Sequence, residues 1–416
     1  MFGALFLIIF LFLITQPLLG KIQRDHPYLK VSFMNKLFWY HMFFGGVYYT
    51  YTLFNRSDSK LYYYRAKNGW DNWSEAFNTG TDFMEWLAYP FVNYLFFNFE
   101  MTMFLFTWFG FIGFIYFYLF FKENLRFNLK IRGYDVITII LFLPNMHFWT
   151  ASLGKGAVIF GGLGLLIYGL SQPRKRIPHL LIGAYVSYMV RPHILVAVLI
   201  GMAVGFVLGK EKVPIYQKVL VSIIGLVFSI IMYDKILLYL GYDPNNFLES
   251  FEEETALNAH RLSYSAGSAV DMSNYNLPMK LFTFWFRPLF IDSPNFLGII
   301  VSLENLLYLY MFTRIINKDF IKYIKDAPAM VKMAGVVFIS ISISMTFIMS
   351  NLGIIIRQKS QIMYFMLFVI IAFLDWQKTN KLKKRALIYN RIVEEERRRR
   401  EEVEVQSTKY DVPRGE

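Results

Sequence analysis

The chain has 416 residues, of which 56% are hydrophobic and 19% aromatic, and it contains no cysteine. This composition is too apolar for a soluble globule, and it excludes disulfides, thiolate metal sites and a cysteine nucleophile. The net charge of +13 is concentrated between apolar runs, where the positive-inside bias of cytoplasmic loops explains it better than nucleic-acid binding. We therefore expect an all-α polytopic membrane protein with no nucleic-acid partner.

The first apolar run, residues 1–19, is long enough to span a bilayer, and the cations after it place the N-terminus outside. A second span over residues 36–54 leads to a polar outer loop at 55–86, and residues 100–121 return the chain to the cytoplasm. Continuing this alternation predicts about eleven transmembrane helices, with the C-terminus inside and every inner loop basic. A second large outer loop is predicted at 241–280.

The predicted transmembrane domain covers residues 1–375, and a charged cytoplasmic tail covers 376–416. Basic and acidic blocks in this tail have the spacing of a solvated helix with charge pairs between successive turns. Its lysines can contact anionic lipid headgroups. The tail is also a candidate surface for a cytoplasmic protein partner.

Three turns between short apolar runs carry cations at membrane depth, at residues 143–157, 190–193 and 351–359. Ionisable side chains at this depth are costly, so they usually face a cavity or a partner. We interpret the three turns as one cationic site. Its candidate residues are His147, Lys155, Arg191, His193, Arg357 and Lys359.

The same topology places three further cationic or titratable residues on the outer side: His260, Arg261 and Arg287. For each residue taken alone, the alternative is a snorkelling anchor or a partner for a loop carboxylate. All nine residues, the six of the three turns and these three, suit a pyrophosphate as a set at the outer leaflet, because guanidinium groups hold phosphate oxygens in a bidentate fork. The expected ligand is a glycan on a polyprenyl pyrophosphate, in a lipid membrane, with no metal or cofactor.

The segment Phe142-Leu-Pro-Asn-Met-His-Phe-Trp-Thr-Ala-Ser-Leu-Gly-Lys-Gly156 resembles the Pro…Phe-Trp-Ser…Gly-Lys-Asp segment of bacterial polysaccharide polymerases of the Wzy and EpsG type. The stretches 191–193 and 356–359 are similar to arginine-bearing positions of that class. This chain has Gly156 where an acidic residue is common. The resemblance implies a GT-C-like membrane glycosyltransferase with a catalytic acid in the first outer loop. Asp58 and Asp82 are then the candidates, the alternative for each being plain loop solvation.

The predicted activity is glycosyl transfer at the outer face of the bacterial cytoplasmic (inner) membrane. Arg191, Arg357 and Lys155 would hold the donor pyrophosphate and stabilise charge on the leaving group. Further predicted substrate-binding residues are Arg261, Arg287 and Lys359. His193 or His147 would deprotonate the acceptor hydroxyl. Two alternatives stay open: a transporter or flippase of lipid-linked glycans, and a non-catalytic membrane subunit of an envelope or secretion complex.

Overall fold

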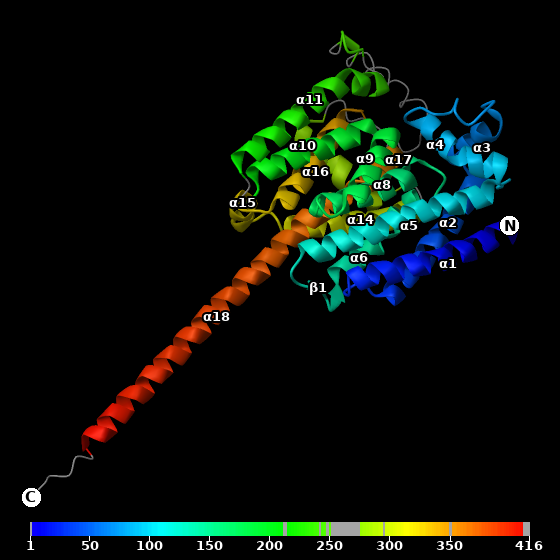
Figure 1. The fold of residues 1–416 in the computed structure, drawn as a ribbon. Helices are drawn as coiled ribbons and strands as arrows, with labels where there is room; N and C mark the ends of the chain where they lie inside the picture. Colours follow the sequence, from blue (N-terminus) through cyan, green and yellow to red (C-terminus); the bar gives the residue numbers. More distant parts are fainter. Residues whose placement is uncertain are drawn as a thin grey trace, which may run out of the picture.

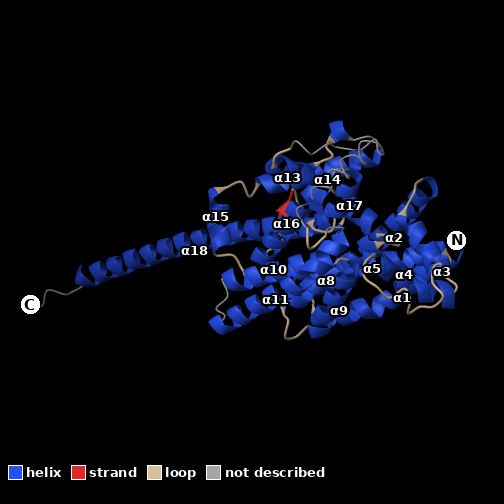
Figure 2. Cartoon of the chain, turned by 90° about the horizontal axis from the view of Figure 1, so that it is seen from above, coloured by secondary structure: helices blue, strands red, loops and turns tan. Residues whose placement is uncertain are grey.

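The structure, a computed structural model, describes residues 2–210, 214–240, 243–246, 249–250, 275–293, 296–348 and 352–410. Helices make up 80% of these residues. Within the described ranges, the sheet is a single antiparallel hairpin of β1 (Lys130–Ile131) and β2 (Tyr134–Asp135). The prediction of an all-α protein is therefore confirmed (Figures 1 and 2).

Three long apolar helices open the chain: α1 (Phe2–Asp25), α2 (Val31–Phe54) and α5 (Phe99–Asn124). Between α2 and α5 lie α3 (Asp58–Asn68), α4 (Thr81–Tyr89) and the π-helical turn η1 (Pro90–Tyr94). The predicted first outer loop, residues 55–86, contains α3 and most of α4. Polar caps fix where two of these helices begin. The Ser57 side chain accepts from the Ser59 backbone N–H at the start of α3, and Asn98 does the same for Met101 in α5.

The next part of the chain forms shorter helices: α6 (Val136–Leu141), α7 (Pro144–Thr150), α8 (Lys155–Ser171), α9 (Ile177–Val190), α10 (Pro192–Leu208) and the longer α11 (Ile215–Leu240). Pro144 and Pro192 each occupy the first turn of a new helix. Proline fits there because its missing N–H would have no helical partner. Both breaks fall in turns that were predicted from the sequence.

The C-terminal part contains α13 (Leu277–Phe286), η2 (Phe290–Asp292), α14 (Phe296–Thr313), α15 (Lys318–Lys325), α16 (Ala329–Ile348), α17 (Leu352–Lys359) and α18 (Met363–Tyr410). The third predicted turn, at 351–359, is mostly helical, since α17 covers residues 352–359. The change of direction comes after it, where α17 meets α18 at 55°. α18 continues without a break from the core into the predicted tail and projects away from the other helices (Figure 1).

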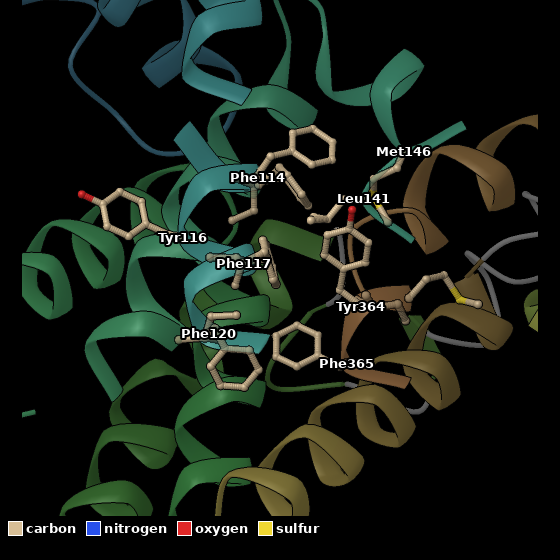
Figure 3. Packing of buried hydrophobic residues seen from close by; sticks show 14 of the residues in the cluster. Phe114, Tyr116, Phe117, Phe120, Leu141, Met146, Tyr364 and Phe365 are labelled. Atoms are coloured by element: carbon tan, nitrogen blue, oxygen red, sulfur yellow. The ribbon is translucent and has the colours of Figure 1, made fainter. Parts of the chain in front are cut away.

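The core is aromatic and tightly packed where α5 meets α8 and the start of α18. A Cβ atom on Gly164 would lie 2.8 Å from the Gly113 carbonyl oxygen, so glycine allows α5 and α8 to approach closely. Figure 3 shows Phe114, Phe117 and Tyr364 in this cluster, and the rings of Phe117 and Tyr364 lie 4.9 Å apart. Edge-to-face contacts of this kind stabilise the packing that holds the site in place.

Among the described residues, three helices are long and apolar enough to cross a membrane: α1, α5 and residues 329–346 of α16. Two bent pairs, α14 with α15 and α17 with α18, raise this number to at most five. The prediction of about eleven transmembrane helices also counts shorter apolar helices such as α8, α9 and α10. That count and the orientation stay predictions.

Several of the loops predicted to be cytoplasmic meet at one end of the helices. Arg176, after α8, binds Glu123 of α5 at 2.6 Å, and the same carboxylate lies 3.4 Å from His26, after α1. The Phe127 backbone N–H donates to Asp375, near the root of the tail, at 2.8 Å. α3 and α4 lie at the other end (Figures 1 and 2).

Candidate functional site

The candidate site is centred on the C-terminal end of α17. Arg357 Nη1 donates to Asp58 Oδ2 at 2.7 Å, across 299 positions of sequence. The next side chain, Gln358, accepts through Oε1 from Arg191 Nη1. An aspartate from the first outer loop and an arginine from another predicted turn therefore contact two successive residues of one helix.

Lys155, the first residue of α8, belongs to the same cluster. Its ammonium group interacts electrostatically with four predicted site residues: Arg191, Arg357, Asp58 and Asp82. His193 in turn experiences the charges of Arg191 and Lys155. The structure therefore brings together six of the predicted site residues, which we call the cationic cluster: Asp58, Asp82, Lys155, Arg191, His193 and Arg357.

The break between α9 and α10 positions part of this cluster. Arg191 is a single residue between the two helices, with φ −152° and ψ 84°, because Pro192 lacks an N–H and restricts the residue before it. The Arg191 side chain is only 5% exposed. The Gly80 backbone N–H donates to the Met189 carbonyl at 2.7 Å, which brings the start of α4, and with it Asp82, to the end of α9.

Two adjoining pockets lie beside the cationic cluster. The polar pocket has a volume of about 400 Å³, and its lining includes Arg56, Asp58 and Arg357. The apolar pocket, of about 520 Å³, lies among α2, α7, α14 and α17 and is lined mainly by aliphatic and phenylalanine side chains. Tyr51, Trp149 and Gly353 line both pockets. The apolar pocket therefore adjoins a pocket that two arginines, Arg56 and Arg357, line.

His147, one of the two predicted histidine bases, lies in the core and lines neither pocket. Its ring stacks on Phe114 with the centroids 4.1 Å apart. Its Nε2 donates to the Leu141 carbonyl at 2.7 Å, and its Nδ1 lies 2.9 Å from His41 Nδ1. Both ring nitrogens are therefore bonded within the protein, and the side chain is separate from the cationic cluster.

Lys359 and Arg287, both predicted to bind substrate, also have their cations engaged within the protein. Lys359 is fully buried, and its Nζ donates to Asn305 Oδ1 at 2.6 Å and to the Arg287 carbonyl at 2.9 Å. The Arg287 guanidinium binds both oxygens of Asp292 at 2.8 Å. Its hydrogen bonds lower the pKa of the Asp292 carboxyl. Two other predicted outer residues, His260 and Arg261, lie outside the described residues.

Glu304 is a buried site neighbour that sequence reasoning missed. Its carboxylate accepts from the Asn145 backbone N–H, in the first turn of α7, and from the Tyr308 hydroxyl. A carboxylate suits this position because the N-terminal end of a helix carries free N–H groups and a partial positive charge. Glu304 therefore anchors α7, which contributes Trp149 to both pockets. The sequence feature that could have indicated this residue is that Glu304 is the single acid inside the apolar run 296–313.

Within the described part of the chain, no group of three or more histidine, aspartate or glutamate side chains could hold a metal ion. Comparison with known proteins found no matching family model, no matching curated protein and no matching solved structure. The resemblance to polysaccharide polymerases therefore rests on the sequence motifs alone, and the function is inferred from the site.

Proposed function

We propose that the chain is a membrane glycosyltransferase of the polysaccharide polymerase type, which joins glycan units taken from a polyprenyl-pyrophosphate donor. The observation that carries this proposal is the pair of adjoining pockets. A polyprenyl pyrophosphate is an apolar chain with a doubly phosphorylated end, and the apolar pocket ends where arginines line the polar one. A ligand of this kind is complementary to both pockets at once.

In the proposed complex, Arg357, Arg191 and Lys155 bind the pyrophosphate. Guanidinium groups suit this role because their paired N–H groups match phosphate oxygens, and their charge persists at any working pH. Asp58 holds Arg357 through its 2.7 Å hydrogen bond, which restricts the rotation of the guanidinium beside the pocket. The same cations stabilise the negative charge that develops on the leaving pyrophosphate.

The transfer itself needs a base. The acceptor hydroxyl oxygen attacks the anomeric carbon, the bond from that carbon to the pyrophosphate oxygen breaks, and its electron pair leaves with the pyrophosphate. In this proposal His193 accepts the hydroxyl proton, because it belongs to the cationic cluster and a neutral imidazole can act as a general base. Asp58 and Asp82 of the cationic cluster are the alternative bases.

The proposal includes the predicted topology: about eleven spans, the N-terminus outside, the cationic cluster at the outer face of a bacterial cytoplasmic membrane, and the tail inside. The basic loops that meet at one end agree with the positive-inside rule for that orientation. The lipid-linked glycan then reaches the site from the outer leaflet, with its prenyl chain in the apolar pocket.

The test uses the purified full-length chain with a polyprenyl-pyrophosphate-linked oligosaccharide. Wild type should produce longer lipid-linked glycans and release polyprenyl pyrophosphate. Arg357→Lys and Arg191→Lys keep the charge but lose the fork, and charge-assisted hydrogen bonds of this kind are worth about ten- to hundred-fold in rate. Arg65→Lys is the matched control, because Arg65 is half-exposed and forms only a 3.6 Å ion pair with Glu85.

Equal activity in all three lysine variants would refute the role of the arginines. If wild type makes no longer product but moves the lipid-linked glycan across a proteoliposome membrane, the protein is a flippase. If it does neither, the protein is a non-catalytic membrane subunit of an envelope or secretion complex.

A further inference from the structure

A third pocket, which contains no residue of the cationic cluster, combines cations with apolar side chains. It has a volume of about 530 Å³ and lies between the β1–β2 hairpin and the C-terminal end of α14. Its lining consists of Lys130, Ile131, Arg132, Leu307, Tyr310 and Arg314. The hairpin adjoins the end of α5 from which Phe127 reaches the root of α18 (Figure 1). The pocket therefore belongs to the end of the molecule that carries the basic loops.

Local geometry explains how three cations come to face one space. Arg132 and Gly133 both have positive φ angles, 49° and 89°, and they form the tight turn that folds Lys130 and Arg132 back beside α14. On the other wall, the Arg314 guanidinium lies 5.5 Å from the centre of the Tyr310 ring. A cation–π contact of this kind orients the arginine without neutralising its charge.

Among the residues that the structure describes, no carboxylate lines this pocket. An acid that lies close by is Asp135, the partner of Lys130 across the hairpin, but its carboxylate contacts other residues. It caps α6 by accepting from the Thr138 backbone N–H at 3.2 Å, and it lies 3.7 Å from the Lys122 ammonium. The three cations of the pocket therefore present an excess of positive charge that suits an anion.

The surface of α14 that leads to the pocket is apolar. A row of large side chains at helical spacing is 44–57% exposed: Ile299, Leu303, Leu306 and Tyr310. One further turn along the same row stands Arg314. α14 then bends by 79° into α15, which carries Lys318, Lys322 and Lys325. An apolar row that ends in cations, followed by a basic helix turned across its direction, is typical of a helix leaving a bilayer through its headgroup layer.

We propose that this pocket binds the phosphate headgroup of an anionic phospholipid, with the acyl chains lying along the exposed row of α14. Lys130, Arg132 and Arg314 bind the phosphate oxygens, and Leu307 and Tyr310 contact the glycerol and the first methylene groups. The exposed row favours a lipid over a soluble phosphate, because it gives acyl chains a surface beside the pocket that a soluble anion would not use. The lipid site lies on other elements than the cationic cluster, and it takes the C-terminal half of α14, whereas the N-terminal half lines the apolar pocket.

Native mass spectrometry of the full-length protein in detergent tests the proposal with phosphatidylglycerol, phosphatidylcholine and the soluble probe glycerol phosphate. The triple variant Lys130→Gln/Arg132→Gln/Arg314→Gln removes the pocket cations. The matched control Lys318→Gln/Lys322→Gln/Lys325→Gln removes the same charge from α15. All six side chains are on the surface, and a monodisperse elution profile for each variant verifies folding.

Wild type and the α15 control should retain one phosphatidylglycerol and no phosphatidylcholine. The pocket variant should bind phosphatidylglycerol about a hundred-fold more weakly, since each cation near an anionic headgroup contributes roughly a factor of five. Equal loss in the α15 variant would show diffuse surface attraction and overturn the site. Full retention by the pocket variant would do the same. Competition by glycerol phosphate at the affinity of the lipid would reassign the pocket to a soluble anion.

Discussion

Replacing Lys359 by methionine distinguishes a structural cation from a substrate-binding one. Methionine keeps the length of the side chain but removes the ammonium that donates to Asn305 Oδ1 at 2.6 Å and to the Arg287 carbonyl at 2.9 Å. Each buried acceptor left without a donor costs about 1–3 kcal/mol. The substitution also removes the desolvation cost of a buried charge, which offsets part of this loss.

We therefore expect Lys359→Met to lower the free energy of unfolding by about 3 kcal/mol, near the lower end of the range for breaking a buried charged network. For a chain of this length, such a loss corresponds to a fall of about 5 °C in the thermal midpoint. The assay is fluorescence-detected size exclusion after heating in detergent, with polymer length on a gel as the second readout.

Lys155→Met is the matched comparison, because Lys155 belongs to the cationic cluster and is only partly buried. The thermal midpoint of this variant should change by about 1 °C at most, as for a side chain away from a packed network. The polysaccharide that it makes should be shorter than that of wild type. A Lys359→Met variant with the wild-type midpoint and no polymer would refute the structural assignment. Lys359 would then bind substrate, as the sequence first suggested.

Three further outcomes are expected. His147→Gln should lower the thermal midpoint and leave polymer intact, whereas His193→Gln should abolish polymer at an unchanged midpoint; the opposite pattern would exchange their roles. The hydrogen bonds from Arg287 lower the pKa of Asp292 in the folded state, so this ion pair stabilises the fold. Its contribution is fully present above the usual aspartate pKa of about 3.9, and it is lost as the pH falls through the lowered pKa of the folded state. The difference in midpoint between wild type and Asp292→Asn should accordingly be constant from about pH 8 to 5 and shrink at lower pH; a constant difference down to pH 2 would contradict this. In this cysteine-free chain, Ser74→Cys should react with an impermeant thiol reagent added outside intact cells and Lys175→Cys should not, and the reverse would overturn the orientation.

The positions of two helix breaks could be predicted from the sequence, because Pro144 and Pro192 act locally on the backbone. The convergence of Arg191, Arg357 and Lys155 was also predicted, since cations at membrane depth need a cavity or a partner. The direction in which a side chain points could not be predicted in this way. His147 and Lys359 obey the same rule as the residues of the cationic cluster, but their partners are protein groups in the core. Glu304 was missed because its partner Asn145 lies 159 positions away.

The contacts at the end of α17 determine which insertions and deletions the chain tolerates. Three successive residues bind three separate parts of the molecule: Arg357 binds Asp58, Gln358 binds Arg191 and Lys359 binds Asn305. Successive side chains on an α-helix point about 100° apart, so each contact depends on the rotational phase of the helix. A substitution at one position breaks one contact. Inserting or deleting a single residue earlier in α17 rotates all three side chains together and breaks every contact at once.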